Sequence, residues 1–318
     1  MMILGLDLGG TKLASALFDA KGKILYRTLE YLKKNRGEQV GLLIKRQIDR
    51  QLKEAKKKNR KLNAIGISVP GIYNHQSGCV WAPNIPGWEQ YPLLKEISSL
   101  PELSKVKVSI DSDRACYILG ETWQGSAKGC SNAIFIAVGT GIGAGILSDG
   151  KIVRGKNDIA GAIGWMTLAR PFKKKYASCG FFEYFASGKG LAQAARDIIR
   201  KKSIKSALAR LPDNKINTKL IFEAYQAGDP IANELMKRAI SYWGMAVANL
   251  VSIFNPEKII FGGGVFGPAA QFLPQIVTEA KKWAQPISMR QVEIELSILG
   301  ADAGLFGAGK LALLAMNT

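Results

Sequence analysis

Residues 5–12 read Gly-Leu-Asp-Leu-Gly-Gly-Thr-Lys, and this stretch decides the fold. It joins an apolar run that contains Asp7 to a second apolar run that begins at Leu13, through two adjacent glycines. This pattern predicts a strand, a tight turn and a second strand. A turn without side-chain bulk also lets backbone N–H groups approach an anion. One such turn by itself is explained equally well by a simple β-hairpin.

The same pattern returns in the middle of the chain, where residues 139–141 form another glycine turn between two apolar runs. Each copy continues through a tight turn into a third short run. The repeat is about as long as a domain, so it predicts two related units and argues against a solenoid. The matching strand-like runs are 3–8, 13–18 and 24–26 in the first copy and 133–138, 142–147 and 151–153 in the second.

Strand-like and helix-like segments alternate along the rest of the chain, which predicts an α/β protein. The expected helices are 39–58, 116–122, 190–201, 230–254, 271–283 and 304–316, and further strands are expected at 64–69, 106–110 and 258–261. At 318 residues the chain is long enough for two domains. We expect an N-terminal α/β unit at 1–117, with a terminal helix at about 303–318 packing back on it, and a second unit at 118–302.

The chain carries 44 basic and 25 acidic residues, which gives a net charge of +19. This charge allows a polyanionic partner. However, basic runs such as 53–61 have no interleaved aromatic residues and match no nucleic-acid motif, so a solvated basic face is expected and no nucleic-acid partner. The single histidine, His75, excludes most metal and triad chemistry, and its place in a predicted turn favours a solvated loop residue.

The four cysteines contain no C-x-x-C pair, which predicts reduced thiols and no disulfide framework. No charged leader with a secretory apolar region precedes the first strand. The most apolar later stretch, 244–254, is too short to span a bilayer. We therefore expect a soluble cytoplasmic protein without a membrane partner.

Three glycine turns are candidates for binding phosphate, and several such turns together make a nucleotide clamp. They are Gly9-Gly10-Thr11-Lys12, Gly139-Thr140-Gly141 and Gly262-Gly263-Gly264. Two common nucleotide motifs are excluded. Residues 139–144 fit G-x-G-x-x-A but lead into a strand instead of a helix, and residues 145–151 fit G-x-x-x-x-G-K but are followed by isoleucine instead of Ser or Thr.

Taken together, these segments resemble the motifs of the ROK sugar kinases over nearly the whole chain and in the same order. The resemblance implies an actin-like ATPase (ribonuclease H-like) fold with two duplicated α/β lobes around a cleft that closes on the sugar. The matching segments are 5–12, 65–71 with 83–88, 111–113 with 119–121, 139–145, 255–265 and 299–305.

The resemblance implies an ATP- and Mg²⁺-dependent kinase that phosphorylates a hexose, with O6 of glucose or a relative as the expected acceptor, and a homodimer as its expected state. ATP and phosphate binding is expected at Asp7, Gly9, Gly10, Thr11, Lys12, Gly139, Thr140, Gly141, Gly262, Gly263 and Gly264, with Asp7 also suited to orient Mg²⁺. Substrate binding is expected at Pro70, Gly71, Asn84, Ser112, Asp113 and Glu183.

Asp113 is the expected general base. A sugar hydroxyl is a poor nucleophile, so a carboxylate within hydrogen-bond reach must accept its proton during phosphoryl transfer. The structural alternative is that Asp111 or Asp113 caps the helix that follows. Lys12 has a similar alternative as an exposed surface lysine.

The chain also departs from the family pattern. The usual Glu-x-Gly-His is replaced by Ala162-Ile163-Gly164-Trp165, and the zinc-binding cysteine cluster is reduced to Cys179. Ser112 and Ala115 stand where the family carries asparagines. Structural zinc needs four ligands, so we expect none here. Trp165 either fills the space left by the shortened zinc loop, which we favour, or stacks on the apolar face of a ring.

Two other functions stay open. The first is a non-catalytic regulator that binds sugar or nucleotide. Because the first strand begins at Met2, we expect no DNA-binding helix-turn-helix before it, and such a regulator acts through a partner protein. The second is a kinase for another acceptor, such as an N-acetylhexosamine, because the two lost side chains contact the sugar in the family. Polyphosphate is a less favoured alternative to ATP as the phosphate donor.

Overall fold

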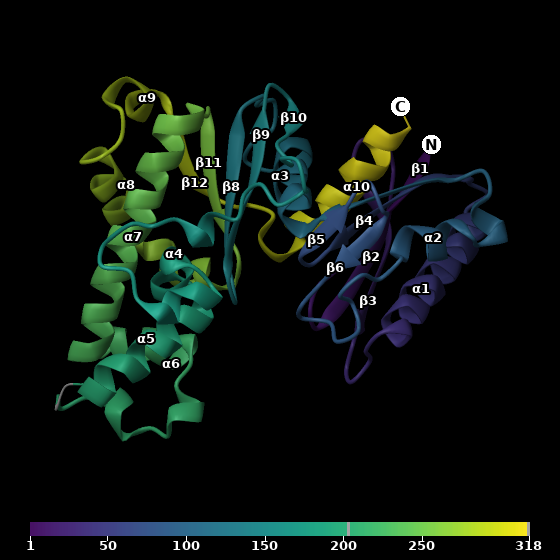
Figure 1. The fold of residues 1–318 in the computed structure, drawn as a ribbon. Coiled ribbons are helices and arrows are strands. Elements are labelled where there is room, and N and C mark those ends of the chain that lie inside the picture. The colour runs from purple at the N-terminus through teal and green to yellow at the C-terminus, as the bar shows by residue number, and fades with distance from the viewer. Residues whose placement is uncertain (202–203, 317–318) are drawn as a thin grey trace. The chain divides into compact units, whose positions relative to one another are not determined.

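The computed structural model describes residues 1–201 and 204–316, which divide into two compact units. Unit 1 consists of Met1–Gly129, Ile152–Ala160 and the described residues from Ile298 onward. Unit 2 consists of Cys130–Lys151 and the described residues of Gly161–Ser297. The α/β class expected from the sequence is confirmed in both units (Figure 1).

The predicted division after residue 117 lies inside a helix, α3 (Asp113–Gln124), and all of this helix belongs to unit 1. A helix is a continuous hydrogen-bonded element, so it stays in one unit. No motif in the sequence indicated that Ile152–Ala160 also belongs to unit 1. The terminal helix α10 (Ala303–Ala315) is in unit 1, and residues 317 and 318 of its predicted range lie outside the described residues.

Unit 1 is built on a five-stranded sheet with the strand order β3-β2-β1-β4-β7. The β1–β2 and β2–β3 pairs are antiparallel, and β4 and β7 continue the sheet in parallel. Its other elements are β1 (Met2–Leu8), β2 (Lys12–Phe18), β3 (Ile24–Tyr31), α1 (Glu38–Lys57), β4 (Leu62–Val69), β5 (Ile72–Asn74), β6 (Cys79–Trp81), α2 (Leu93–Ser98) and β7 (Lys107–Ser112).

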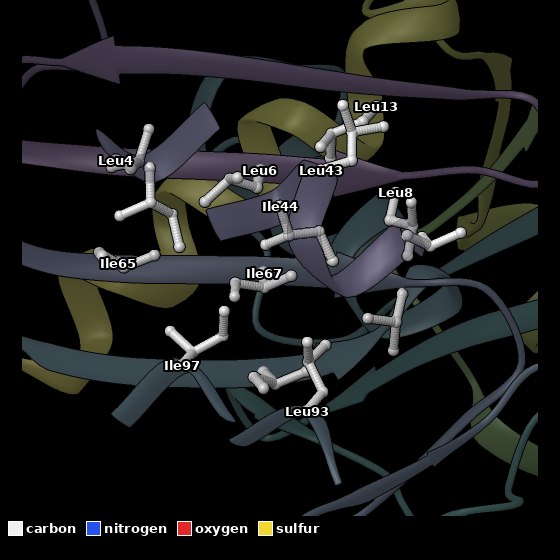
Figure 2. Close-up of a cluster of buried hydrophobic side chains, with 14 of the residues drawn as sticks. Leu4, Leu6, Leu8, Leu13, Leu43, Ile44, Ile65, Ile67, Leu93 and Ile97 are labelled. Atoms are coloured by element: carbon white, nitrogen blue, oxygen red, sulfur yellow. The ribbon is translucent and has the colours of Figure 1, made fainter. Parts of the chain in front are cut away.

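Alternate residues of β1 point to opposite faces of this sheet, as the pleat of a strand requires. Leu4, Leu6 and Leu8 are buried with side chains of α1 and α2 such as Ile44 and Ile97 (Figure 2). The opposite face is covered by α10, whose backbone approaches so closely that a Cβ on Gly66 would lie 1.9 Å from a carbonyl oxygen of this helix. Asp7 points to the face that α10 covers.

Unit 2 is built on a sheet with the equivalent order β10-β9-β8-β11-β12. Its β8–β9 pair is antiparallel, and β11 and β12 continue it in parallel, as β4 and β7 do in unit 1. The predicted duplication is thus seen in the topology. The elements are β8 (Ala133–Val138), β9 (Ile142–Ser148), β10 (Lys151–Ile152), α4 (Phe181–Ala186), α5 (Gly188–Lys201), α6 (Thr218–Gln226), α7 (Pro230–Phe254), β11 (Lys258–Gly262), α8 (Leu273–Lys281), α9 (Pro286–Gln291) and β12 (Glu293–Leu296).

All four cysteines are free thiols, as their spacing predicts. None of the described helices is both long and apolar enough to cross a membrane.

Candidate active site

The end of β7 and the start of α3 carry three consecutive polar residues, and the structure gives each a different role. Ser112 is the N-cap of α3, because its hydroxyl oxygen accepts the Ala115 N–H at 3.4 Å. Asp111 is buried, and its Oδ1 accepts the Ser112 N–H at 2.8 Å. The N-cap is therefore Ser112, whose hydroxyl, expected at the substrate, is engaged in the cap. Asp113 also accepts an N–H of the first helical turn, that of Arg114.

Asp113 follows as the first residue of α3, with a half-buried carboxylate. Its Oδ1 accepts the N–H of Arg114 at 2.8 Å, and its Oδ2 lies 3.4 Å from the hydroxyl of Tyr117. Burial raises the pKa of Asp113 to about 6, and the negative charge of Asp7 acts in the same direction, while Arg114 and the hydrogen bond from Tyr117 lower it. A carboxylate with this pKa is mostly ionised at neutral pH and still basic enough to take a proton.

Asp7 lies near the carboxyl end of β1, directly opposite Ser68 of β4. The Ser68 hydroxyl donates a hydrogen bond of 2.7 Å to its Oδ1, and a Cβ on Gly304 would lie 2.6 Å from the same oxygen. Burial raises the pKa of Asp7, which Ser68 and Lys12 partly offset. No described Lys or Arg side chain forms an ion pair with Asp7. A largely buried carboxylate without a paired cation suits a divalent metal that also takes water and phosphate oxygens.

The first glycine turn connects β1 to β2 and is closed by a hydrogen bond of 2.9 Å from the Gly9 N–H to the carbonyl of Lys12. The carbonyl of Thr11 accepts the Leu32 N–H at 2.9 Å. The N–H groups of Gly10 and Thr11 donate to no described residue. The turn is thus a hairpin that leaves two backbone donors available for an anion.

The predicted sugar-side residues follow β4. Pro70 is buried. Gly71 has a left-handed φ of 92°, and a Cβ at this position would collide with the carbonyl oxygen of Trp81. Asn84 is exposed, and a Cβ added to Gly10 would lie 3.5 Å from the Cβ of Asn84. The structure therefore brings Asn84 beside the first glycine turn, with an amide that bonds to no described residue.

The second glycine turn lies between β8 and β9 in unit 2. The Gly139 N–H donates to the carbonyl of Gly141 at 3.0 Å, and the carbonyls of Gly139 and Thr140 accept the N–H groups of Gly188 and Lys189 at 2.8 and 3.2 Å. The N–H groups of Thr140 and Gly141 donate to no described residue. The start of α5 thus binds the carbonyl groups of the turn, and the N–H groups of Thr140 and Gly141 stay available for an anion.

Glu183 of α4 supports this second turn. Its Oε2 accepts the N–H of Ile142 at 2.6 Å, and a Cβ on Gly141 would lie 2.6 Å from the same oxygen. Burial raises the pKa of Glu183, while the Ile142 N–H and Lys189 lower it. The residue expected to contact sugar therefore has one oxygen engaged with the backbone of the turn, and its Oε1 accepts no hydrogen bond from a described residue.

The third glycine turn follows β11, the strand next to β8. Gly262 packs against the ring of Phe135, and Gly263 needs a left-handed φ of 92°. A Cβ on Gly263 would lie 2.5 Å from the carbonyl oxygen of Val138, the last residue of β8. The second and third turns therefore lie side by side at the carboxyl ends of adjacent parallel strands, where ligands bind in open α/β sheets.

Trp165 is 57% exposed and therefore does not fill the space of the shortened zinc loop, so our favoured interpretation is wrong. That space is filled by aromatic packing around Tyr176, whose ring contacts those of Phe181, Tyr184 and Phe185. Among the described residues, no cluster of three His, Cys, Asp or Glu side chains offers a metal site. The absence of zinc stays a prediction.

Four site features were not found from the sequence: Ser68 at Asp7, Tyr117 at Asp113, the Asp111–Arg154 ion pair, and the contact of His75 with Asp158. The Arg154 Nη2 lies 2.5 Å from Oδ2 of Asp111, and the His75 Nδ1 lies 2.7 Å from Oδ1 of Asp158. Tyr117 stands four residues after Asp113, a spacing that aligns side chains on a helix and could have revealed it. The other three are long-range contacts without a local signal.

Comparison with known proteins points to one family. The ROK family model matches residues 3–315. A glucokinase of Halalkalibacterium halodurans is 32% identical over 314 residues, which cover 97% of this chain and 94% of that protein. The structure of the ROK hexokinase from Thermus thermophilus has a TM-score of 0.83 at 28% identity and covers 100% of this chain and 99% of that chain. A ROK family glucokinase from Streptomyces griseus, solved with glucose and AMPPNP, has a TM-score of 0.75 at 27% identity. The match covers 99% of this chain and 100% of that chain. These similarities confirm the predicted actin-like ATPase fold.

Proposed function

The chain belongs to the ROK family and is similar over nearly its whole length to carbohydrate kinases, and we propose that it transfers the γ-phosphoryl group of ATP to a hexose hydroxyl. The observation that carries this proposal is the state of Asp113. One oxygen of its half-buried carboxylate accepts the Arg114 N–H and the other lies 3.4 Å from the Tyr117 hydroxyl, and burial raises its pKa to about 6, which suits a base that accepts a hydroxyl proton near neutral pH.

In this proposal unit 1 holds the acceptor and the base. Asp113 accepts the proton of the attacking hydroxyl, while Asn84 and the backbone of the Pro70-Gly71 turn orient the sugar. Asn84 suits this role because its amide can donate and accept hydrogen bonds and is engaged by no described residue. Positioning of this kind supplies most of the rate in phosphoryl transfer, since the reaction needs little other covalent chemistry.

The glycine turns hold the nucleotide phosphates. The backbone donors of Gly10 and Thr11 in unit 1, and of Thr140 and Gly141 in unit 2, are the groups available to them. Asp7 would hold Mg²⁺, which would supply positive charge to neutralise the phosphate oxygens. Lys12 adds a positive charge at the first turn.

We propose glucose or a related hexose as the acceptor, with its O6 as the attacking atom, because proteins named glucokinase are similar over almost the whole chain. Ala162 and Trp165 replace two side chains that contact sugar in the resembling motif. A site that loses polar partners discriminates less between sugars. An N-acetylhexosamine is therefore a second acceptor to test.

A coupled assay of ADP release, run with a panel of hexoses and N-acetylhexosamines, tests the proposal. Sugar-dependent ADP release with at least one hexose is the expected result. Binding of ATP without ADP release on any sugar would contradict a kinase and favour a regulator that senses nucleotide or sugar.

A further inference from the structure

The segment Ile152–Ala160 lies some forty residues after Asp113 in the sequence but belongs to the same unit. Arg154 of this segment donates from Nε and Nη2 to Oδ2 of Asp111, at 3.1 and 2.5 Å. In return, Nη1 of Arg114 donates to the carbonyl oxygens of Ile159 and Ala160, at 3.5 and 3.3 Å. The segment is therefore fixed to residues on both sides of Asp113.

Asp111 connects Arg154 to the backbone that carries the base. Only 3% of Asp111 is exposed, and a buried carboxylate is costly unless a cation and hydrogen bonds compensate it. Its second oxygen accepts the Ser112 N–H, and the Ser112 hydroxyl caps α3. A continuous chain of contacts thus runs from the guanidinium of Arg154 to the turn from which Asp113 projects.

We propose that Arg154 is a positioning residue for Asp113 and acts through the carboxylate of Asp111. This inference rests on the proposed function, because it assigns Asp113 as the base. Arg154 does not touch the acceptor in this account. Two of its N–H donors converge on one oxygen of Asp111, Oδ2, and this paired contact, which the single nitrogen of a lysine ammonium cannot make, fixes the position of that oxygen.

A further contact holds the segment Ile152–Ala160 independently of Arg154, so Arg154 can be replaced without detaching the whole segment from unit 1. The backbone N–H and Nδ1 of His75 lie 3.0 and 2.7 Å from the two carboxylate oxygens of Asp158. Neither this contact nor the two carbonyl contacts of Arg114 involves Arg154, so we expect them to remain when Arg154 is changed. The matched control is Lys156, an exposed cation of the same segment that forms no hydrogen bond or ion pair with a described residue.

The kinetic test compares Arg154→Met, Arg154→Lys and Lys156→Met with the parent in steady state. Displacement of a reacting group by ~1 Å costs about 100-fold, so we expect Arg154→Met to lower kcat by about 10- to 100-fold. The KM values for ATP and acceptor should stay within about twofold, since ground-state contacts are kept. Arg154→Lys should recover part of kcat, and Lys156→Met should match the parent. A kcat of Arg154→Met within threefold of the parent, or a loss confined to KM, would overturn the proposal.

Hydrogen–deuterium exchange gives a readout that does not depend on activity. In Arg154→Met the amides of residues 112–115 should exchange at least tenfold faster, while those of α1 keep the parent's rate. Unchanged protection of residues 112–115 would overturn the positioning role. If the parent itself transfers no phosphate, the proposed function fails, while the exchange result still decides whether Arg154 holds this turn.

Discussion

The hydroxyl of Tyr117 lies 3.4 Å from Oδ2 of Asp113, one turn further along α3. The carboxylate thus has a donor for each of its oxygens, because the Arg114 N–H binds Oδ1. Both donors favour the ionised form, and burial opposes it more strongly, so the pKa rises to about 6. This balance between burial and hydrogen bonding would suit Asp113 to the proposed role of a base near neutral pH.

The rate should therefore depend on the ionisation of Asp113. Since the base must be deprotonated, kcat/KM is expected to be constant above pH 7 and to fall about tenfold per pH unit below a midpoint near 6. The charged groups that act on Asp113 are Asp7, Arg114 and, through its hydroxyl, Tyr117. Tyr117→Phe removes a donor to the ionised form and should move this midpoint upward. A pH–rate profile that stays flat down to pH 5 would contradict the assignment.

The same pKa predicts that Asp113 destabilises the protein at neutral pH. The pKa of Asp113 in the folded state, about 6, lies above the ordinary value of 3.8. The contribution of neutral Asp113 to the free energy of unfolding is therefore fully present below pH 4 and is lost as the pH rises through 6. Asp113→Asn should then raise the free energy of unfolding at pH 8 by about 1–3 kcal/mol and change it little at pH 4.

Thermal unfolding at several pH values measures this effect. Asp49→Asn, a change of an exposed carboxylate on α1, is the matched control and should show no such gain. An Asp113→Asn variant that is less stable than the parent at pH 8 would show that the charge contributes to folding and would weaken its assignment as a strained functional group.

The sheets and the glycine turns could be predicted from the sequence because their signals are local. The run before Asp7 and the glycines after it specify a hairpin, and the second copy around Gly139 repeats the pattern. By contrast, β12 at the edge of the second sheet was not predicted, although Ile294 and Leu296 alternate with two glutamates, because the strand is only four residues long and partly exposed. The Asp111–Arg154 pair joins residues 43 positions apart and depends on tertiary packing alone.

Glu183 lies against the second glycine turn, whereas the resemblance implied a contact with sugar. If it supports the second turn as the structure places it, Glu183→Ala should weaken binding of ATP by about 10- to 150-fold, since it removes a charged hydrogen bond worth about 1.5–3 kcal/mol to the backbone N–H of Ile142. Calorimetry with a non-hydrolysable ATP analogue measures this, and Glu223→Ala, at an exposed position of α6, is the control. A variant that loses only sugar affinity would restore the role implied by the motif.

Lys175 connects the shortened loop to α4 and α5, and we expect it to stabilise this loop. The ammonium of Lys175 lies 4.4 Å from the ring centroid of Tyr184 and 3.1 Å from its hydroxyl, and it pairs with the carboxylate of Asp197. We expect Lys175→Met to lower the free energy of unfolding by about 1–2 kcal/mol and Lys174→Met to leave it unchanged.

The protein should correspondingly contain negligible zinc when it is purified without chelator. Its thermal stability should be the same with and without EDTA, because the loop is held by aromatic packing and Lys175. Elemental analysis that finds close to one zinc per chain would refute this account of the loop.

The central claim is that this chain phosphorylates a sugar with Asp113 as the base, and transfer from γ-labelled ATP tests it most directly. The parent and Asp113→Asn are compared with mass detection of the phosphorylated sugar, after calorimetry has established that both bind nucleotide and acceptor. The account predicts a phosphohexose from the parent and a rate lower by about two to four orders of magnitude in Asp113→Asn, with nearly unchanged affinities. Turnover of Asp113→Asn within tenfold of the parent, or no phosphorylated product from the parent on any hexose or N-acetylhexosamine, would contradict it.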